Sequence, residues 1–347
     1  MNEVVVLADG VFCSDGTVQL SSELNEQVAE LIANNPDIHC IQTNKGFSNT
    51  TWQVLNDKVL FSRPDIWLRV YGFYDSECDF SFLDLLPNLS KLWANCLRAA
   101  NNIEKIAQLT KLTHLHLSIE SITSFEFLAQ LPRSLVSLHL GKTKSKRPSL
   151  AFLSHHLELE ELSIHGHAKC FETVGQLSQL KSLGLAGVKI NTFDALSRLD
   201  VLQELSLDLM PKKLFNDVLA IKHVKHLSIS EIRTLDNLAF LTEFTQLIGL
   251  KLYYLKHVTS LPNLKQATML TDISLYELSG LTSVEGIAPC KQLKTFYFSC
   301  TTKMQPSDFS LLTHLPKLEK ATVGTGSFKK NDTIADMLTQ AGIKATR

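Results

Sequence analysis

Four histidines come nearest, by type and spacing, to forming a metal site in this sequence: His114, His116, His139 and His165. Zinc needs three or four converging ligands at about 2 Å. His116 and His139 stand at equivalent points of an alternating apolar pattern, which would place them about 5 Å apart on neighbouring strands. A flat sheet does not make such side chains converge, and no Cys or carboxylate stands at the matching points. We therefore expect a polar surface patch without a metal, whose imidazoles would make partner binding sensitive to pH.

Carboxylates form the second group with the right type for chemistry: Glu160, Glu161, Glu204 and Asp208. A hydrolase that works with two carboxyl groups must keep their pKa values apart, which requires two different environments. These four stand at positions expected on an open strand face, where nothing encloses them. We expect a solvated acidic stripe that steers a basic partner.

Motifs for nucleophilic or phosphate chemistry are missing from the sequence. It contains no G-x-x-x-x-G-K-[ST], G-x-G-x-x-G, H-E-x-x-H or G-x-S-x-G. One alternative is an enzyme or toxin whose active site lies in residues 1–64, where the candidates are Asp9, Cys13, Asp15 and His39. About sixty residues rarely make an independent catalytic domain. We therefore predict that the chain is not an enzyme and uses no cofactor. Alanine substitutions of those four residues that left activity in the native host intact would remove the support for the alternative.

Composition is that of an ordinary globular protein. The 347 residues are 44% hydrophobic and 20% charged, with a net charge of −1. This length exceeds a usual single core, so the chain should form two domains or one linear array. A nucleic-acid binder would carry a clustered excess of Lys and Arg. The longest basic stretch, residues 142–147, is predicted to be a solvated loop, and no nucleic-acid partner is expected.

Cysteine usage and the first residues bear on the compartment. Seven cysteines form no C-x-x-C pair, which favours free, mostly buried thiols in a reducing environment. Residues 1–9 lack the basic segment of a signal peptide, and no apolar run is long enough to span a membrane. We predict a cytoplasmic protein without membrane contact. A third alternative, an exported adhesin-like repeat protein, would need an export signal that these residues lack.

A repeat organises most of the chain and must position these side chains. The pattern L-x-x-L-x-L is clear in segments such as 112–117 and 202–207. With weaker copies, it starts at residues 65, 89, 112, 135, 159, 180, 202, 224, 247, 270, 293 and 318. About 12 units of about 23 residues therefore fill residues 65–325.

Each unit has two readable halves. In L-x-x-L-x-L, apolar and polar residues alternate, as in a strand with one buried face. In the second half, apolar residues such as Ile190, Phe193, Leu196 and Leu199 recur at roughly helical spacing and predict a short helix or 3₁₀ turn. One unit cannot bury both faces alone. Stacked units would share a continuous core and form a parallel sheet.

The repeats resemble the leucine-rich-repeat superfamily, and most of all the short bacterial repeats of the internalin type. The resemblance covers about three quarters of the chain. It implies an α/β solenoid, a horseshoe with a parallel sheet on its concave face and capped ends. The family often has Asn three residues after the last strand leucine, where its amide satisfies backbone groups of the turn. This sequence has other residues there, including His167, Val188, Met210, Ile232 and Leu255. No asparagine ladder is expected, so these turns must satisfy their backbone differently.

Segments outside the repeats are expected to cover the ends of the core, because solenoid ends expose apolar surface. Residues 1–64 predict an α/β cap, with a strand near residues 4–7 and a helix that begins at Ser22 and ends before Pro36. Residues 326–347 predict a helical cap that starts at Asp332 and stops at Gly342. We expect a monomer.

Strand positions between the leucines are expected to face the concave surface, where the resemblance implies that partners bind. The predicted partner-binding residues are Trp93, His116, His139, Glu161, Glu204, Asp208, Lys251, Tyr253, Asp272, Tyr276 and Tyr297. Tyr253 and Tyr276 follow the last core residue of their strands, and Tyr297 stands between two core phenylalanines. Aromatic rings with charged neighbours are typical of interface hot spots. The three tyrosines should therefore form one aromatic patch.

These observations favour a non-enzymatic protein-binding module of a bacterial cell, which uses the concave face of the solenoid. An adaptor, or an inhibitor or immunity-type protein that occludes its partner, is the more specific hypothesis. The sequence does not identify the partner protein.

Overall fold

The computed structural model describes residues 4–72, 77–96, 99–145 and 148–346. Lys146 and Arg147 of the predicted basic loop lie outside these residues. The chain divides into two compact units, residues 1–180 (unit 1) and 181–347 (unit 2). The repeat spacing found in the sequence continues on both sides of this division.

Unit 1 contains a sheet that starts antiparallel and continues parallel. Strands β1, β2 and β3 form an antiparallel meander, and β3, β4, β5, β7, β9, β10 and β11 then pair in parallel, each with the next. The bounds are β1 Val5–Ala8, β2 Val11–Ser14, β3 Thr17–Leu20, β4 Cys40–Thr43, β5 Trp67–Gly72, β7 Lys91–Cys96, β9 His114–Ile119, β10 Ser137–Leu140 and β11 Glu161–His165. Helix α1 (Glu26–Asn34) and helix α2 (Asn49–Val54) precede the regular repeats, and β6 (Cys78–Asp79) pairs with β8 (Ala100–Asn101) in a separate small sheet.

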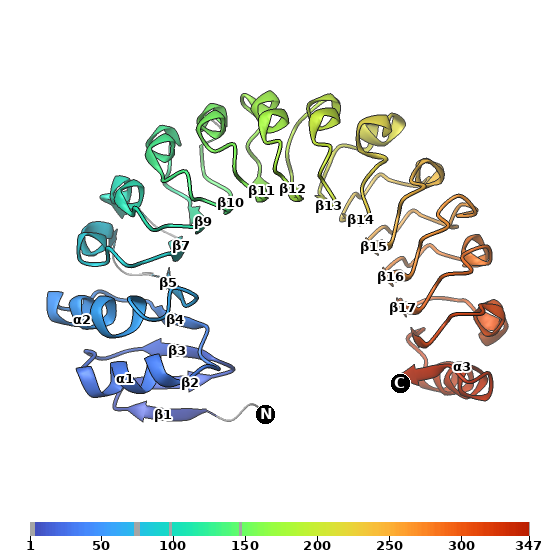
Figure 1. The fold of residues 1–347 in the computed structure, drawn as a ribbon. Helices are drawn as coiled ribbons and strands as arrows, with labels where there is room; N and C mark the ends of the chain where they lie inside the picture. The colour runs from blue at the N-terminus through green and yellow to red at the C-terminus, as the bar shows by residue number, and fades with distance from the viewer. Residues whose placement is uncertain (1–3, 73–76, 97–98, 146–147, 347) are drawn as a thin grey trace. The chain divides into compact units, whose positions relative to one another are not determined.

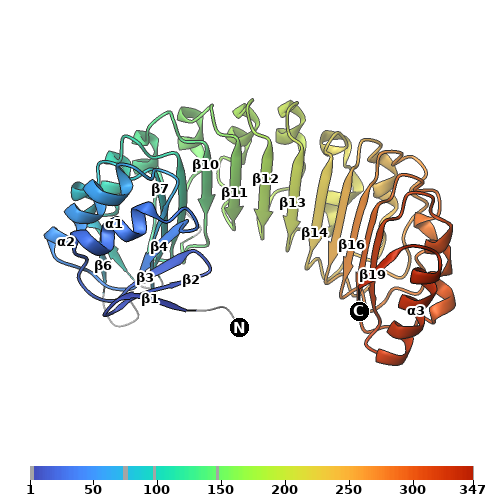
Figure 2. The ribbon, with the colours of Figure 1, turned by 60° about the horizontal axis from the view of Figure 1, so that its bottom comes forward.

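Unit 2 contains an entirely parallel sheet, in which each strand pairs with the next one along the chain. The bounds are β12 Ser182–Ala186, β13 Glu204–Asp208, β14 His226–Ser230, β15 Gly249–Tyr253, β16 Asp272–Tyr276, β17 Thr295–Ser299, β18 Lys320–Gly324 and β19 Lys344–Thr346, with helix α3 (Phe328–Gln340) between the last two strands. Figure 2 shows β12, β13 and β14 running side by side in the same direction.

Within each unit the strands line the inner side of a curved row, and short helical turns lie on the outer side (Figure 1). Most of these turns are 3₁₀ helices, as in Asp194–Arg198, where the Leu196 amide donates to the Phe193 carbonyl. The predicted alternation is confirmed: Leu205 and Leu207 are 1% and 0% exposed, and the residues between and beside them face outward. The core therefore lies between the sheet and the outer turns, and the other sheet surface, the inner face, is free to carry functional side chains.

In unit 2, most strands are followed directly by a residue whose backbone is left-handed. Leu209, Glu231, Tyr254 and Glu277 have φ between 51° and 55°, and each amide donates to the carbonyl at the end of the next strand. For example, the Tyr254 amide donates to the Tyr276 carbonyl at 2.9 Å. Non-glycine residues adopt this backbone region at a cost. The pairing of parallel strands imposes this backbone conformation, because the conformation lets the amide of the turn donate to a carbonyl at the end of the next strand.

Apolar side chains occupy the place of the missing asparagine ladder. Val188, Met210, Ile232, Leu255 and Leu278 are 0 to 3% exposed. In unit 1 the same place holds Glu120, Thr143 and His167; His167 is buried, and its Nε2 lies 2.9 Å from the Gly141 carbonyl. The prediction of turns without an amide ladder is confirmed, and these positions extend the core instead.

The two ends contain the expected kinds of element with different boundaries. Helix α1 begins after Asn25, whose side chain accepts from the Val28 amide, because the Ser22 hydroxyl donates to the Asp9 carbonyl instead. Helix α3 begins after Ser327, so Asp332 lies inside it; the Asn331 side chain accepts from the Thr325 amide and fixes this earlier start. Strand β19, which was not predicted, pairs with β18. In the described ranges, none of the helices has the length and apolar character needed to cross a membrane.

Candidate protein-binding surface

A column of large side chains crosses four neighbouring strands on the inner face of unit 1. Arg69, Trp93, His116 and His139 are successive Cα partners on β5, β7, β9 and β10. The Arg69 guanidinium carbon lies 4.3 Å from the Trp93 ring centroid, and the Trp93 and His116 centroids lie 4.8 Å apart. His116 and His139 are stacked, with centroids 3.8 Å apart and planes 20° apart. We call these four residues the aromatic ladder. Trp93 and His116 are each covered on both ring faces by their neighbours in the ladder, and both side chains are half-buried.

Burial keeps the imidazoles of the ladder neutral. Desolvation, followed by the nearby His139 and Arg69, lowers the pKa of His116 to about 3. Desolvation and His165 lower the pKa of His139. A neutral imidazole offers one N–H donor and one acceptor nitrogen. At neutral pH the ladder can therefore hydrogen-bond a partner through its imidazole edges, while Arg69 supplies the charge.

Metal binding does not fit the geometry of these histidines. The lone pair of an imidazole lies in the ring plane, and nearly parallel rings do not aim their lone pairs at a common point. No group of three or more His, Cys, Asp or Glu that could hold a metal ion occurs among the described residues.

Trp67, Lys91, His114 and Glu161 lie beside the ladder. Trp67 packs edge-on against His114 with ring centroids 5.7 Å apart, and the Lys91 ammonium group lies 6.0 Å from the Trp67 centroid. Desolvation and Lys91 lower the pKa of His114, and Glu161 opposes this shift. Glu161 is exposed at the start of β11 and so acts on this cluster through its charge.

Tyrosines form a second cluster, on the inner face of unit 2. Tyr253 and Tyr276 are Cα partners, and their ring centroids lie 6.3 Å apart in an edge-on arrangement. Tyr254 approaches Tyr276 still more closely, at 5.3 Å. Tyr297 lies in the adjacent column. Burial raises the pKa of Tyr253, and the electrostatic interaction with Tyr297 raises this pKa further. We call these four residues the tyrosine cluster.

Charged side chains border the tyrosine cluster on the same sheet. Lys251 is exposed on β15, in the column of Ser274 and Tyr297. Asp272, at the start of β16, accepts hydrogen bonds from the hydroxyls of Thr271 and Thr295. The structure therefore places one cation and one carboxylate on the side of the cluster where Tyr297 lies, and Asp272 is at the opposite end of β16 from Tyr276.

The predicted acidic pair of unit 2 does not resemble a hydrolase site. Glu204 and Asp208 lie at opposite ends of β13, which separates their Cα atoms by about 13 Å at the usual strand rise. Each binds a different serine: the Ser182 hydroxyl donates to Glu204 at 3.4 Å, and the Ser230 hydroxyl donates to Asp208 at 2.7 Å. They are two separate surface carboxylates of the inner face.

The in-register leucines decide the fold. Leu183, Leu205, Leu227 and Leu250 are successive Cα partners, all at most 2% exposed, and belong to successive L-x-x-L-x-L units. The chain has the leucine-rich-repeat fold.

The solved structures to which this chain is similar include leucine-rich-repeat proteins of several kinds. An internalin from Listeria monocytogenes has 13% identity, with 95% of this chain and 86% of that chain covered and a TM-score of 0.37. A leucine-rich-repeat protein from Leptospira interrogans has 16% identity, with 94% and 99% covered and a TM-score of 0.34. TLR13, in a complex with single-stranded RNA, has 16% identity, with 89% and 57% covered and a TM-score of 0.46. No protein-family model and no curated protein matches the sequence.

The candidates for an enzymatic N-terminal segment are divided between the two ends of β2: Asp9 precedes this strand, whereas Cys13 and Asp15 lie at its end, near the Gly16 on which His39 packs. Asp9 and Asp15 lie in the turns at opposite ends of β2. Asp15 and Gly16 have φ of 47° and 69° and make the tight turn of a hairpin. His39 packs directly over Gly16, where a β-carbon would lie 2.4 Å from its Nδ1 atom. These residues have visible roles in the shape of the cap.

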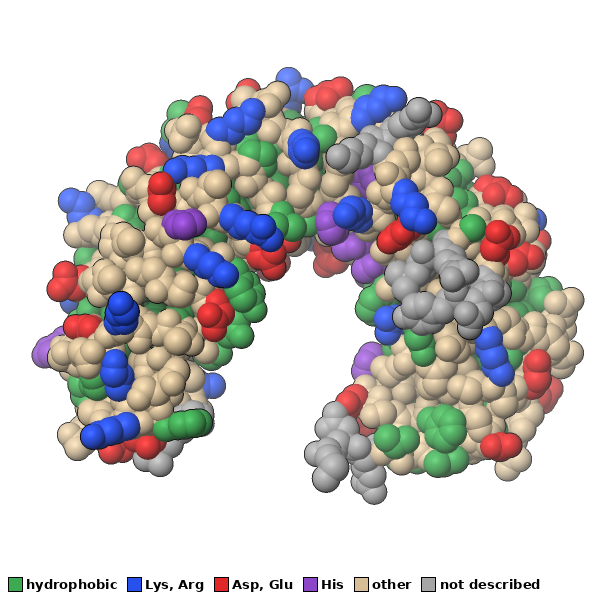
Figure 3. Space-filling view, turned by 180° about the vertical axis from the view of Figure 1, so that it is seen from behind, with side chains coloured by type: hydrophobic (Ala, Val, Ile, Leu, Met, Phe, Trp, Pro, Cys, Tyr) green, Lys and Arg blue, Asp and Glu red, His purple; other side chains and the backbone are tan. Residues whose placement is uncertain are grey.

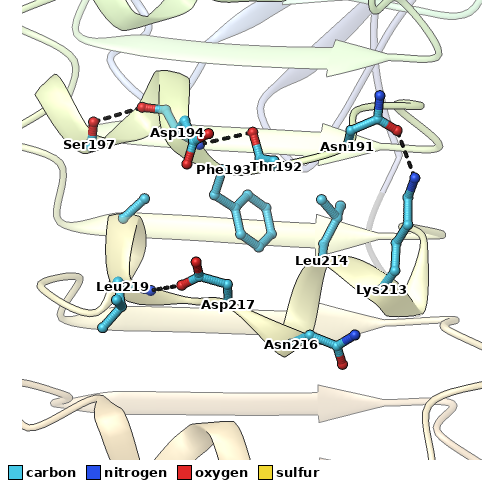
Figure 4. Close-up of a pocket in the computed structure, with 11 residues that line it drawn as sticks. Asn191, Thr192, Phe193, Asp194, Ser197, Lys213, Leu214, Asn216, Asp217 and Leu219 are labelled. Atoms are coloured by element: carbon cyan, nitrogen blue, oxygen red, sulfur yellow. Dashed lines mark hydrogen bonds between the residues drawn. The ribbon is translucent and has the colours of Figure 1, made fainter.

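A hollow of about 400 Å³ lies among the outer turns of unit 2 (Figure 4). Its polar groups are used locally. Lys213 donates to Asn191 at 2.7 Å, and the Asp217 side chain accepts from the Leu219 amide at 3.1 Å. These bonds hold turns together, so the hollow is less suited to a ligand than the inner face.

Sequence reasoning missed Tyr254, Arg233 and Lys256. Tyr254 follows a strand and would ordinarily be assigned to a loop, and only its left-handed backbone brings its ring to Tyr276. Arg233 and Lys256 stand at matching places two residues beyond the left-handed residues Glu231 and Tyr254. Their equal spacing in successive repeats was a signal that could have indicated a charged rim.

Proposed function

We propose that this leucine-rich-repeat chain is a non-enzymatic protein-binding module that anchors its partner on the inner face of unit 2. The supporting observation is the tyrosine cluster, which places four rings on and beside neighbouring strands. Tyr297 is 39% exposed and Tyr254 is 43% exposed. The backbone beneath them is held by the ladder of β15, β16 and β17. Large, rigid aromatic side chains give contact area with little loss of conformational entropy, which is why they dominate interface hot spots.

Glu204 and Asp208 set the approach of the partner in this proposal. Exposed charges at a distance from the anchor mainly change the association rate. An adaptor, or an inhibitor or immunity-type protein, acts by occupying a partner surface in this way. We further propose that the protein is a monomer in the bacterial cytoplasm. The location is supported by the cysteines of the described ranges, which are free thiols, five of them buried.

Site-specific crosslinking tests this proposal. A photoreactive phenylalanine analogue at Ser274, between Lys251 and Tyr297 in register, should capture a protein in cells of the source. The same analogue at Ser197, on an outer turn, is the matched control.

Rates measured with the captured protein then complete the test. Tyr276→Ala and Tyr297→Ala should each weaken binding through faster dissociation, by about 2 kcal/mol at a hot spot. Glu204→Lys should slow association. Normal binding by both tyrosine variants, together with loss of binding in Arg198→Glu on an outer turn, would refute the role of the inner face.

A further inference from the structure

A charged hollow adjoins the tyrosine cluster where the strands of unit 2 end. It has a volume of about 390 Å³ and is lined by Glu231, Arg233, Tyr254, Lys256 and His257. Tyr254 belongs both to this hollow and to the tyrosine cluster, because its ring lies 5.3 Å from that of Tyr276. Figure 3 looks at the carboxyl ends of the strands, and Lys and Arg side chains lie along this side of unit 2.

The cations of this hollow are free to bind a ligand. Within the described part of the chain, neither the Arg233 guanidinium nor the Lys256 ammonium group has a hydrogen-bond or ion-pair partner. The nearby Asp236 is already bound to Lys212 at 2.7 Å. Arginine in particular recognises carboxylates through paired N–H donors. The lining of the hollow contains two cations and one carboxylate, that of Glu231.

We propose that this hollow binds an acidic side chain of the protein partner that the tyrosine cluster anchors. The inference rests on the proposed function and adds the chemistry of the partner: an extended segment with an Asp or Glu close to an apolar residue. Tyr254 lines the hollow and contacts Tyr276 at 5.3 Å between ring centroids, so the two subsites adjoin. An extended chain advances about 3.3 Å per residue, so a carboxylate two or three positions from the apolar anchor, about 7 to 10 Å along the chain, is the spacing to test.

Glu231 and Glu277 favour an acidic protein segment over a nucleic acid. Both are left-handed residues in the same row of turns as Arg233 and Lys256, at matching points of their repeats. A phosphate backbone carries charge at every step and would meet these carboxylates. A peptide can place single carboxylates beside the cations and neutral residues beside the glutamates.

Paired peptides on the full chain test the proposal. The probes are 12-residue peptides with an aromatic or aliphatic anchor and one Asp or Glu two or three positions away, each matched by an Asn or Gln counterpart. We expect the acidic member to bind about tenfold more tightly, as for a charge-assisted hydrogen bond. The difference should disappear in Arg233→Glu/Lys256→Glu and persist in the charge-matched control Arg198→Glu/Lys222→Glu on the outer turns.

Two further measurements separate the ways to fail. If Tyr276→Ala weakens the peptides but acidic and amide members bind alike, or no peptide binds, the acidic subsite is refuted while the crosslinking result decides the proposed function. If Tyr276→Ala has no effect on either the peptides or the captured protein, the proposed function itself fails. A 12-nucleotide single-stranded RNA is the last probe: binding of the RNA that is lost in Arg233→Glu/Lys256→Glu, without a peptide difference, would assign the hollow to nucleic acid and overturn the proposal.

Discussion

Acid should destabilise unit 1 through the aromatic ladder. His116 has a folded-state pKa of about 3, lowered by burial and by the charges of His139 and Arg69. In the unfolded chain its pKa returns to about 6.5. Between these values the unfolded chain binds more protons than the folded chain, so stability falls as the pH drops from about 6.5 toward 3. Above pH 6.5 the imidazole is neutral in both states and contributes no pH dependence.

The size of this effect follows from the two pKa values. A pH of 5 is about 1.5 units below the pKa of the unfolded imidazole, and this difference corresponds to about 2 kcal/mol in favour of unfolding. Partial exposure of His116 reduces this figure, so we expect a contribution of about 1 to 2 kcal/mol. The lowered pKa values of His139 and His114 act in the same direction and add to the total loss.

Denaturant unfolding at pH 7.5 and pH 5 measures this contribution. His116→Gln removes the titrating group, so its loss of stability between the two pH values should be about 1 to 2 kcal/mol smaller than that of the wild type. His314→Gln, at an exposed histidine of unit 2, should leave the difference unchanged. Nuclear magnetic resonance of the folded protein should show His116 titrating below pH 4. A midpoint between pH 6 and 7, or equal pH dependence in wild type and His116→Gln, would show that the stacked imidazole is not protected from protonation.

Three other predictions concern packing, backbone and metal. Leu205→Ala should cost about 2 to 5 kcal/mol in denaturant melts, whereas Ser206→Ala on the inner face should change stability little; a loss below about 0.5 kcal/mol at Leu205 would contradict its place in the core. Leu209→Gly should raise stability by about 0.5 to 1 kcal/mol relative to Leu209→Ala, because glycine adopts its φ of 52° without strain, and equal melts would show that no strain is stored there. Purified protein should hold less than stoichiometric zinc and melt at the same temperature with a chelator; a chelator-dependent loss that vanishes in His116→Ala/His139→Ala would establish the metal site that the stacking argues against.

Period and register could be predicted from the sequence, because one repeated pattern decides both. The alternation that buries Leu205 and Leu207 also places Glu204 and Asp208 on the inner face. Equivalent positions in successive units predicted that His116 would lie opposite His139 and that Tyr253 would lie opposite Tyr276, and the strand pairing confirms both. Such relations follow from counting residues, since strands alternate faces and parallel repeats stay in step.

Side-chain geometry and turn conformation could not be predicted in the same way. The stacking of Arg69 on Trp93 depends on rotamers that only the packed neighbours select. Tyr254 adopts a left-handed backbone against its intrinsic preference, because its amide needs the carbonyl of Tyr276. Local propensity points away from this conformation, and the ladder overrides it. Tyr254 was missed for this reason, whereas Arg233 and Lys256 had a readable signal in their matching positions.

The apolar column in place of an amide ladder bears on how such a chain can change length. Val188, Met210, Ile232, Leu255 and Leu278 pack by shape, and each turn amide is satisfied by the next strand regardless of which side chain stands there. A duplicated or deleted unit would therefore meet the same kind of neighbour that it left. The reach of the binding surface is adjustable in whole-repeat steps, by gene duplication or by protein engineering, while the chemistry of each step is chosen independently on the inner face.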